Sequence, residues 1–569
     1  MAQPTETSAA PPTPPVSDAR RLAQRAKAAA PRLAELSQSQ IDAIVTAVAL
    51  AAQARVESFA RLAVEETGFG VVADKIQKNR FAAERVYEFI KPMRTVGVIH
   101  RDDTRRVVEI AEPFGVVAAI VPSTNPTSTA IYKILIALKA RCPIVISPHP
   151  SAAQCITQVA EVLNAAALAA GAPDGAVNWM TQLSLDGTQE LMRHRDVAVI
   201  LATGGMGLVR AAYSAGKPAY GVGPGNAPCY IERTADVAKA AGDILLGKSF
   251  DNGVLCSSPN SVVVDAAVAD EARRQFQAQG GYFLSAAEAK ALAAALVTPQ
   301  RLPNPAFVGK SATHIAQALG IRVPENTRAL IAELDGVGRD FPLSIEKLCP
   351  VLSYYVVADW QEGCERCKQI LRYGGMGHTM SIHSQNEPVI LEFGLKKPAF
   401  RICVNTPTTH GSIGLTTGLD PAMTLGCGGY GGNITSDNIT PRHLLNIKRL
   451  AYELRPASTG RSPAPTAGPR LPRTTPAAPE AGLTAASVTA HVEALLAGRS
   501  GAAPAAAQIV ATSTPSIAQF VCEEDVRQAI ALGRTILIGE RTIVTPLARE
   551  VGEAGKVLVQ AGWSGTGAR

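Results

Sequence analysis

The chain has few charged and few aromatic residues for its length. Charged residues make up 18% and aromatic residues 5% of the 569 residues. No apolar run is long enough to span a bilayer, and residues 1–15 are polar and proline-rich rather than signal-like. The net charge is +7, but the arginines are scattered rather than gathered in a basic stripe with interleaved aromatics. We therefore expect no membrane segment, no secretory signal and no nucleic-acid partner.

Paired metal-ligand motifs are also missing. The ten cysteines lie far apart, which predicts reduced thiols and a cytoplasmic protein. The single CxxC motif, Cys364 to Cys367, has no second CxxC and no nearby His pair. We therefore expect no metal site, and we expect this motif on a helix with partly buried thiols.

What is present is an alternation of strand and helix patterns. Residues 17–92 have apolar residues at helical spacing, and strand-like apolar runs follow at 107–110, 115–122, 144–147 and 197–202. Helix patterns lie between the later runs, at 128–141 and 151–169. This alternation predicts an α/β fold with a doubly wound parallel sheet, which binds ligands at the carboxyl ends of its strands.

Composition also divides the chain into six parts. We expect them to be a disordered N-terminus, a first strand–helix region with strands near 95–112, a second strand–helix region, a Gly-rich element with a helix over 441–453, a linker, and a small module of unassigned role. Their predicted bounds are, in the same order, 1–16, 17–234, 235–424, 425–455, 456–515 and 516–569. The Pro/Ala-rich linker contains an amphipathic helix pattern at 484–497, with Val488, Val492, Leu495 and Leu496 on one face. In the last module we expect a helix at 523–532 and a strand at 535–538.

One cysteine lies in a segment of small residues. Cys256 follows Phe250-Asp251-Asn252-Gly253-Val254-Leu255 and precedes Ser257-Ser258. Gly253 allows close backbone approach, and the serines could donate to a thiolate or begin a helix that faces it. The alternative is an ordinary small buried cysteine.

Four other positions carry candidate chemistry. Asn125 directly follows a strand, where its amide could donate to an oxyanion or simply begin a turn with Pro126. Thr203-Gly204-Gly205 ends a strand and opens a helix, which suits a cofactor phosphate. Glu346 could accept from ribose hydroxyls or be a surface glutamate, and His378 could act as acid or base or be structural.

Together these motifs resemble the aldehyde dehydrogenase superfamily, above all its CoA-acylating branch of acetaldehyde and propionaldehyde dehydrogenases. The resemblance covers about residues 20–454. It lies in the segments 112–116, 121–128, 147–150, 202–205, 221–226, 250–258 and 425–428. It implies a Rossmann-type cofactor domain over 17–234 with bridging strands near 95–112, an α/β catalytic domain over 235–424 and a bridging oligomerisation element over 425–455.

The resemblance also implies roles for individual residues. Cys256 matches the family nucleophile, Asn125 the oxyanion amide, Glu346 the glutamate that holds the nicotinamide ribose, and His378 the histidine of the acylating branch. The residues implied to line the cofactor site are Ile120, Val121, Pro122, Ser123, Thr124, Asn125, Ser147, His149, Thr203, Gly204, Gly205, Gly223, Glu346 and Leu348. Ser147-Pro148-His149 stands where hydrolytic members have Lys-Pro-Ser, so NAD is expected and NADP is not excluded.

Val222 occupies the position at which hydrolytic members carry their water-activating glutamate. The resemblance therefore implies that a thioester on Cys256 passes to CoA, so that a short aldehyde, NAD⁺ and CoA give acyl-CoA and NADH. The alternatives are a hydrolytic dehydrogenase that yields a free acid and a non-catalytic cargo or scaffold protein. The family implies a homo-oligomer, either a dimer or a tetramer. The pattern at 484–497 resembles the peptides that dock enzymes inside bacterial microcompartments.

Overall fold

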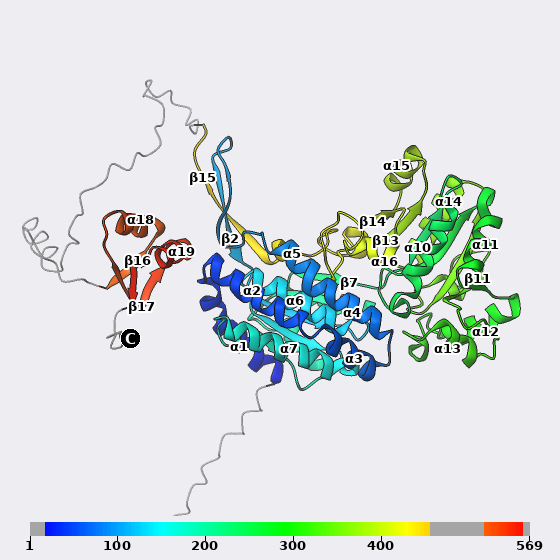
Figure 1. The fold of residues 1–569 in the computed structure, drawn as a ribbon, viewed down its shortest axis with the longest axis horizontal. Coiled ribbons are helices and arrows are strands. Elements are labelled where there is room, and N and C mark those ends of the chain that lie inside the picture. Colours follow the sequence, from blue (N-terminus) through cyan, green and yellow to red (C-terminus); the bar gives the residue numbers. More distant parts are fainter. Residues whose placement is uncertain (1–16, 456–516, 561–569) are drawn as a thin grey trace, which may run out of the picture.

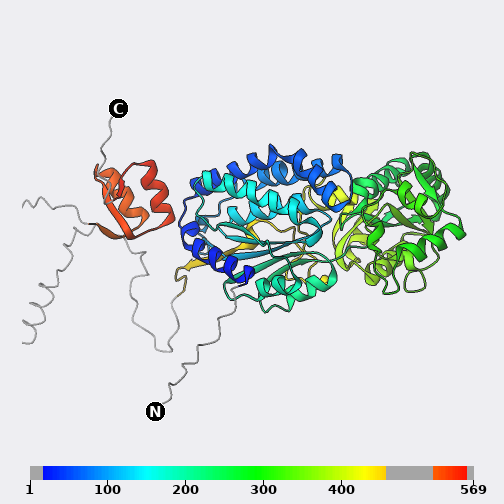
Figure 2. The ribbon, with the colours of Figure 1, turned by 90° about the horizontal axis from the view of Figure 1, so that it is seen from below.

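The computed structural model describes residues 17–455 and 517–560. The predicted N-terminal disorder and the whole predicted linker, with its helix pattern at 484–497, lie outside these residues. The described part contains two parallel sheets covered by helices, an antiparallel three-stranded sheet, and a small C-terminal unit (Figures 1 and 2). The α/β fold predicted from the strand–helix alternation is confirmed.

The first sheet has five parallel strands in the order β5-β4-β3-β6-β7. The chain starts in the middle at β3, runs outward through β4 and β5, and returns to the other side of β3 with β6. The connections on the two sides of this switch point leave a crevice at the carboxyl ends of β3 and β6. The strands are β3 (Val116–Val121), β4 (Ile144–Pro148), β5 (Val177–Trp179), β6 (Val197–Thr203) and β7 (Ala219–Val222).

Helices cover both faces of this sheet. The β3 strand is therefore buried on both sides, which explains why its sequence is apolar throughout. Val117, Ala119 and Val121 belong to a buried cluster with residues of α2, α6 and α7 on one face. Val116, Ala118 and Ile120 belong to a cluster with residues of α1, α8 and α9 on the other. The helices of this part are α1 (Asp18–Ala34), α2 (Gln38–Gln53), α3 (Val56–Thr67), α4 (Val72–Arg80), the π-helical turn η1 (Phe81–Arg85), α5 (Val86–Ile90), α6 (Pro126–Lys139), the 3₁₀ turn η2 (Pro150–Ala152), α7 (Ala153–Ala169), α8 (Leu185–Arg193) and α9 (Met206–Tyr213).

The second sheet has seven parallel strands in the order β10-β11-β12-β9-β8-β13-β14. Helices α10 and α11 cover one face, while α14 and α15 cover the other. The strands are β8 (Ala227–Ile231), β9 (Pro259–Asp265), β10 (Gly281–Phe283), β11 (Ala329–Glu333), β12 (Val351–Val357), β13 (Gly377–His383) and β14 (Ala399–Val404). The helices are α10 (Val237–Ser249), α11 (Ala269–Ala278), α12 (Ala286–Leu296), α13 (Ala312–Ala318), α14 (Trp360–Tyr373), α15 (Glu387–Leu395) and α16 (Thr408–Ser412).

Because β8 pairs with β9 and β13, the chain passes from one sheet to the other at residues 223–226. The predicted boundary after residue 234 is therefore too late. The predicted helix for the CxxC motif is confirmed: Cys364 and Cys367 lie on α14. Both thiols are buried, whereas the pattern predicted partial burial.

The third sheet is antiparallel, in the order β1-β2-β15, and projects beyond the first sheet (Figure 1). Its strands are β1 (Gly97–Asp102), β2 (Val107–Pro113) and β15 (Leu445–Ala451). The helix predicted over 441–453 is wrong. The chain makes only a 3₁₀ turn, η8 (Pro441–Leu444), before β15 pairs residue for residue with β2, from Leu445 opposite Pro113 to Ala451 opposite Val107.

The C-terminal unit is a three-stranded parallel sheet with two helices. Its elements are β16 (Ala518–Val521), α18 (Glu523–Ala531), β17 (Ile536–Val544), α19 (Pro546–Ala554) and β18 (Leu558–Gln560). The predicted helix at 523–532 is confirmed, and the predicted strand at 535–538 is confirmed but extends to Val544.

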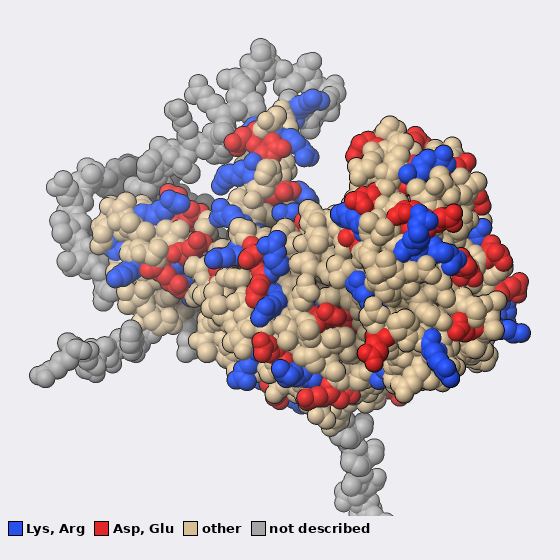
Figure 3. All heavy atoms as spheres, turned by 45° about the vertical axis from the view of Figure 1, so that its right-hand side comes forward, with Lys and Arg blue, Asp and Glu red and all other residues tan. Residues whose placement is uncertain are grey.

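Within residues 17–455 and 517–560, no single helix has the length and hydropathy of a membrane span. Helices α2 and α3 meet that test only as a pair, bent by 61°. The face of the molecule in Figure 3 carries acidic and basic side chains interspersed. On the projecting sheet, Lys448 pairs with Glu112 at 3.0 Å and Arg449 pairs with Glu109 at 2.9 Å.

Candidate active site

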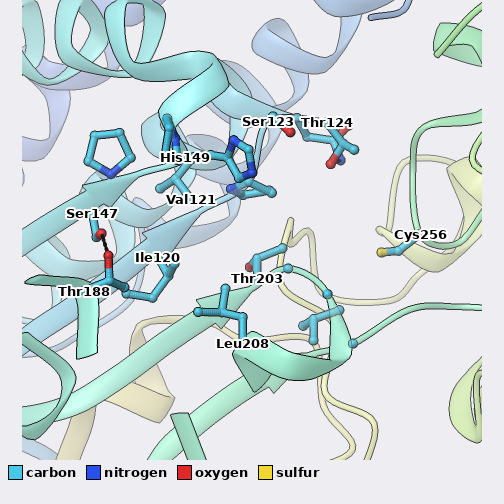
Figure 4. A pocket seen from close by; sticks show the side chains of 18 of the residues that line it. Ile120, Val121, Ser123, Thr124, Ser147, His149, Thr188, Thr203, Leu208 and Cys256 are labelled. Carbon is cyan, nitrogen blue, oxygen red and sulfur yellow. Dashed lines mark hydrogen bonds between the residues drawn. The ribbon is translucent and has the colours of Figure 1, made fainter. Parts of the chain in front are cut away.

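A cavity of about 440 Å³ opens at the carboxyl ends of β3, β4, β6 and β7, at the switch point of the first sheet. The second sheet closes it with the segment that carries Cys256. Figure 4 shows Cys256 on the wall opposite Ile120, Val121 and His149. The lining includes all the positions that the family resemblance assigned to the cofactor: Ile120, Val121, Pro122, Ser123, Thr124, Asn125, Ser147, His149, Thr203, Gly204, Gly205, Gly223, Glu346 and Leu348.

Cys256 lies in a turn that leads into β9, which begins at Pro259. Ser257 and Ser258 belong to this turn and do not begin the helix considered above. Asp251, Asn252 and Gly253, upstream of the turn, have φ values of 50°, 53° and 73°. Three successive left-handed residues turn the chain sharply after α10. Within residues 17–455, Cys256 is the one cysteine that is not buried.

The surroundings of Cys256 favour the protonated thiol. Although Cys256 is partly exposed to the cavity, the protein packed around its thiol desolvates it and raises its pKa to about 12. Glu346 and Cys427 contribute less in the same direction, while Arg401 lowers the pKa. The effect of Arg401 is smaller than that of desolvation, so the thiol is protonated at neutral pH in this structure.

Gly225 brings three segments together. A Cβ on Gly225 would lie 2.0 Å from the Cys256 carbonyl oxygen and 3.3 Å from Cγ of His378, so a side chain has no room there. The Gly225 N–H donates to Glu346 Oε1 at 2.9 Å. Burial raises the pKa of Glu346 to about 7, so this carboxyl group titrates near neutral pH and is not a surface glutamate.

His378 lies near the site but not in the lining of the cavity. It is buried at the start of β13, with Nδ1 2.9 Å from Oγ1 of Thr379. Its Nε2 has no hydrogen-bond partner among the described residues. Burial, with help from Arg401, lowers the pKa of His378 to about 3. The imidazole is therefore neutral at physiological pH, and its role in the reaction stays a prediction.

Asn125 ends the loop after β3 and precedes α6, whose first residue is Pro126. Its side chain does not cap the helix. Instead Oδ1 accepts a hydrogen bond from Lys78 Nζ at 2.6 Å, and Nδ2 donates to Thr124 Oγ1 at 3.2 Å. The asparagine is therefore held by side-chain contacts and is more than a turn residue.

A second buried lysine, Lys133, holds the switch point itself. Its Nζ donates to the carbonyl oxygens of Ile120 on β3 at 2.7 Å and Leu201 on β6 at 2.9 Å. Burial lowers the pKa of Lys133 to about 7. The lysine ties together the ends of the two strands between which the cavity opens.

The lining of the cavity has groups that suit a dinucleotide. The Thr203 hydroxyl lines it and has no hydrogen-bond partner among the described residues. Gly205 precedes α9 without a side-chain cap, and a Cβ there would meet nothing within 4 Å. Free backbone N–H groups at a helix start suit a phosphate. Farther along, Ser147 and Thr188 share a hydrogen bond of 2.9 Å (Figure 4).

Val222 also lines the cavity and is buried, so no carboxylate stands at the position of the hydrolytic base. Sequence reasoning did not assign the remaining lining residues to the site: Pro148, Pro150, Leu183, Ser184, Leu185, Thr188, Leu208, Pro224 and Val254. Several of these follow the carboxyl ends of strands, and that position is the signal by which they could have been found.

Comparisons with known proteins identify the family of this chain. Residues 4–281 match the Aldehyde dehydrogenase family model. The bifunctional aldehyde-alcohol dehydrogenase AdhE of Escherichia coli K12 is 44% identical over 77% of this chain and 49% of its own. The chain therefore spans about half the length of that curated relative. An acetylating aldehyde dehydrogenase structure from Geobacillus thermoglucosidasius is 48% identical, with a TM-score of 0.76, over 78% of this chain and 97% of its own.

Two further solved structures are more distant. A propionaldehyde dehydrogenase from the Clostridium phytofermentans fucose utilisation microcompartment is 29% identical, with a TM-score of 0.69, over 77% of this chain and 98% of its own. One from Rhodopseudomonas palustris, with bound CoA and an acylated cysteine, is 26% identical, with the same TM-score and the same coverage. The sequence motifs, the two-sheet fold and these matches together show that this chain belongs to the aldehyde dehydrogenase family.

Proposed function

We propose that the protein oxidises a short-chain aldehyde, acetaldehyde or propionaldehyde, with NAD⁺ and CoA to acyl-CoA and NADH. The observation that carries this proposal is the presence of Cys256 and Val222 in one cavity. The cavity has a nucleophile but no carboxylate at the place of the hydrolytic base. The acetylating enzyme from Geobacillus and the acylated cysteine of the Rhodopseudomonas enzyme support the same chemistry.

The first step is the attack of the Cys256 sulfur on the aldehyde carbonyl carbon, which gives a thiohemiacetal. The Asn125 amide N–H and the Cys256 backbone N–H hold the oxygen that becomes negative in this step. The thiol must lose its proton to react. The pKa of His378 lies far below that of the thiol, so this imidazole is not proposed as the acceptor of that proton.

The nicotinamide supplies the hydride acceptor when the dinucleotide is bound. Glu346 would hold its ribose, and the start of α9 with Gly205 would hold its phosphates. Loss of hydride from the thiohemiacetal leaves an acyl thioester on Cys256. The CoA thiol then takes the acyl group and frees the cysteine. Val222 keeps this thioester from a base-activated water, which would otherwise yield a free acid.

The oligomeric state and location are proposed on separate grounds. Leu450 in β15 of the projecting sheet and Tyr452 just after β15 are exposed, which supports a homo-oligomer, either a dimer or a tetramer. The amphipathic pattern at 484–497 and the likeness to a microcompartment enzyme support a cytoplasmic protein that is packed inside a microcompartment through its tail.

The test follows NADH absorbance with acetaldehyde and propionaldehyde, with and without CoA, and identifies the products by mass. Sustained NADH formation that requires CoA and yields acyl-CoA is expected. A free acid formed without CoA would show a hydrolytic enzyme instead. Absence of NADH under all conditions, in a folded protein that binds NADH, would favour a non-catalytic role.

A further inference from the structure

Helix α4 carries two lysines into the protein interior. Lys75 and Lys78 lie three residues apart, on the same side of the helix, and are only 1% and 2% exposed. Lysine is almost never fully buried unless its ammonium is paired. The site mechanism above uses neither residue, so their burial needs a separate explanation.

Both lysines contact the same carboxylate. Asp251 is fully buried; its Oδ2 lies 3.0 Å from Lys75 Nζ and is also bonded by Lys78 Nζ. Its Oδ1 accepts from the Val71 N–H at 2.7 Å. Partly buried Asp74 completes the cluster by accepting from the Asp251 backbone N–H at 2.7 Å. The cluster therefore contains two ammonium groups and two carboxyl groups, and it anchors the left-handed turn upstream of Cys256.

Lys78 makes one contact that Lys75 does not make. Its Nζ donates to Asn125 Oδ1 at 2.6 Å, whereas Lys75 Nζ donates to the Thr124 backbone carbonyl at 3.2 Å. An ammonium group has only donors, so it can bond the oxygen of an amide but not its nitrogen. The contact therefore fixes which way the Asn125 amide faces. One N–H of its nitrogen is used by Thr124 Oγ1, and the other is free for the cavity.

We infer that Lys78 is a positioning residue for the reaction: its ammonium holds the Asn125 amide with the N–H₂ toward the cavity and strengthens that group as a donor to the oxyanion. A positive charge on the amide oxygen polarises the N–H bonds, and charge-assisted hydrogen bonds are the stronger ones. This inference rests on the proposed oxyanion role of Asn125. Asp251 in turn holds Lys78, so one buried cluster connects the Asn125 loop and the Cys256 loop.

The competing explanation is that Lys78 only neutralises Asp251. Lys75→Met is the matched control, because it removes an equal charge from the same carboxylate and leaves the amide contact in place. Lys78→Met keeps Asp251 paired with Lys75, so the variant retains a partner for the buried carboxylate. Thermal unfolding of both variants shows that each is folded before any rate is compared.

The measurement is the single-turnover burst of NADH with NAD⁺ and aldehyde in the absence of CoA. The burst reports thiohemiacetal formation and hydride transfer, whichever acceptor later takes the acyl group. We expect Lys78→Met to slow the burst about 10- to 100-fold, with the Kd for NADH unchanged. Lys75→Met should slow it by less than about threefold.

A double-mutant cycle separates positioning from structure. If Lys78 acts through the amide, adding Lys78→Met to Asn125→Ala should slow the burst by no more than about twofold further. Adding Lys75→Met to Asn125→Ala should give the product of the single effects. Independent, multiplying effects of Lys78→Met and Asn125→Ala would overturn the inference, as would equal losses in the two lysine variants.

The wild-type burst separates this inference from the proposed function. A burst followed by free acid would refute CoA acylation and leave the Lys78 cycle fully interpretable. If wild-type protein gives no burst, crystal structures of the wild type and Lys78→Met decide. An amide that keeps the same orientation and position without the lysine would overturn the inference, and a displaced or rotated amide would support it.

Discussion

The Glu346 carboxyl group accepts a hydrogen bond from the Gly225 backbone N–H at 2.9 Å, and Gly225 is the residue against which the Cys256 carbonyl packs. The Glu346 side chain, which is proposed to hold the nicotinamide ribose, is thus held by the Gly225 backbone, and that backbone also packs against Cys256. A shift of Glu346 would be felt at Cys256, so cofactor binding and positioning of the nucleophile are joined through one glycine.

Glu346 should make cofactor binding depend on pH. Its pKa in the folded protein is about 7, raised by burial from 4.5, so the carboxylate that accepts from ribose hydroxyls forms as pH rises through 7. NADH should therefore bind more tightly at about pH 8 than at about pH 6. Fluorescence titration measures the Kd. A Glu346→Gln variant should lose this pH dependence, and an unchanged pH profile in that variant would refute the assignment.

Burial of the Glu346 carboxyl group should also make the stability of the protein depend on pH. Between about pH 4.5 and 7 the folded protein keeps a proton on Glu346 that the unfolded chain has lost. The contribution of Glu346 to the free energy of unfolding therefore falls as pH rises through that window. The difference in free energy of unfolding between Glu346→Gln and the wild type should therefore shift in favour of the variant when the pH is raised from about 4.5 to above 7. Thermal unfolding at both pH values provides the comparison.

Removing the Asn125 amide should cost transition-state stabilisation. Asn125→Ala should lose about 2.7–4 kcal/mol, the range for one oxyanion donor, and the loss should appear in the NADH burst rate with little change in NADH binding. Asn178→Ala is a control, because that buried amide bonds the Ile144 and Gly175 carbonyls away from the cavity. A loss below about tenfold, with acylation rate-limiting, would count against the oxyanion role.

A base placed at position 222 should divert the thioester to water. Val222→Glu should produce some free acid at the expense of acyl-CoA, measured by mass. Because Val222 is only 2% exposed, the new carboxyl group should also lower stability. Val222→Gln has the same shape without the base and should still yield acyl-CoA. Identical products from both folded variants would contradict the proposal that Val222 directs the thioester to CoA and not to water.

Cys256 should be slow to alkylate at neutral pH. Its pKa is about 12, so the rate of carboxymethylation should rise about tenfold per pH unit up to at least about pH 10, without a plateau. Cys522, the other cysteine that is not buried, is removed by Cys522→Ala so that peptide mass spectrometry follows one site. Cys256→Ala should abolish NADH formation while NADH binding stays near normal; substantial activity in that variant would disprove the assignment.

The tail should be dispensable for catalysis. Truncation after Ala457 keeps all of the described residues 17–455 and should leave an active dehydrogenase. Residues 456–500 fused to a fluorescent protein should enter microcompartments of the native host, and Val492→Glu with Leu496→Glu should prevent this by removing the apolar stripe. A diffuse signal from the unmutated fusion, in cells with assembled shells, would refute docking. Inactivity of the truncated protein would assign residues 517–560 to the catalytic unit.

Sequence patterns predicted the secondary structure correctly where it depends on residues that are close in the chain. The β6 strand and the glycines after it predict the start of α9, because a strand, a turn and a helix follow one another along the chain. The wrong helix over 441–453 shows the limit. Pro441 suits a helix start, but the segment from Leu445 pairs with β2, more than 300 residues earlier in the chain. No pattern within the segment could reveal that partner.

In the active site, too, some residues could be predicted from local motifs and others could not. Cys256, Asn125 and Glu346 could be proposed from family-like motifs, and the fold brings them to one cavity. Lys78 had no such signal, because a lysine on a short helix is ordinarily a solvated residue. Its contacts to Asp251 and Asn125 span 173 and 47 residues, and only the packing of α4 between the two loops makes them.

Burial of Lys133 couples the folding of the protein to the binding of a proton. Its pKa is about 7 in the folded state and 10.5 in its ordinary range, so between these values the unfolded chain holds a proton that the native protein lacks. Unfolding in that window takes up a proton from the buffer, and the contribution of this group to stability rises with pH. The strand ends at the cavity are thus held by a lysine whose burial makes the heat of unfolding depend on the ionisation enthalpy of the buffer.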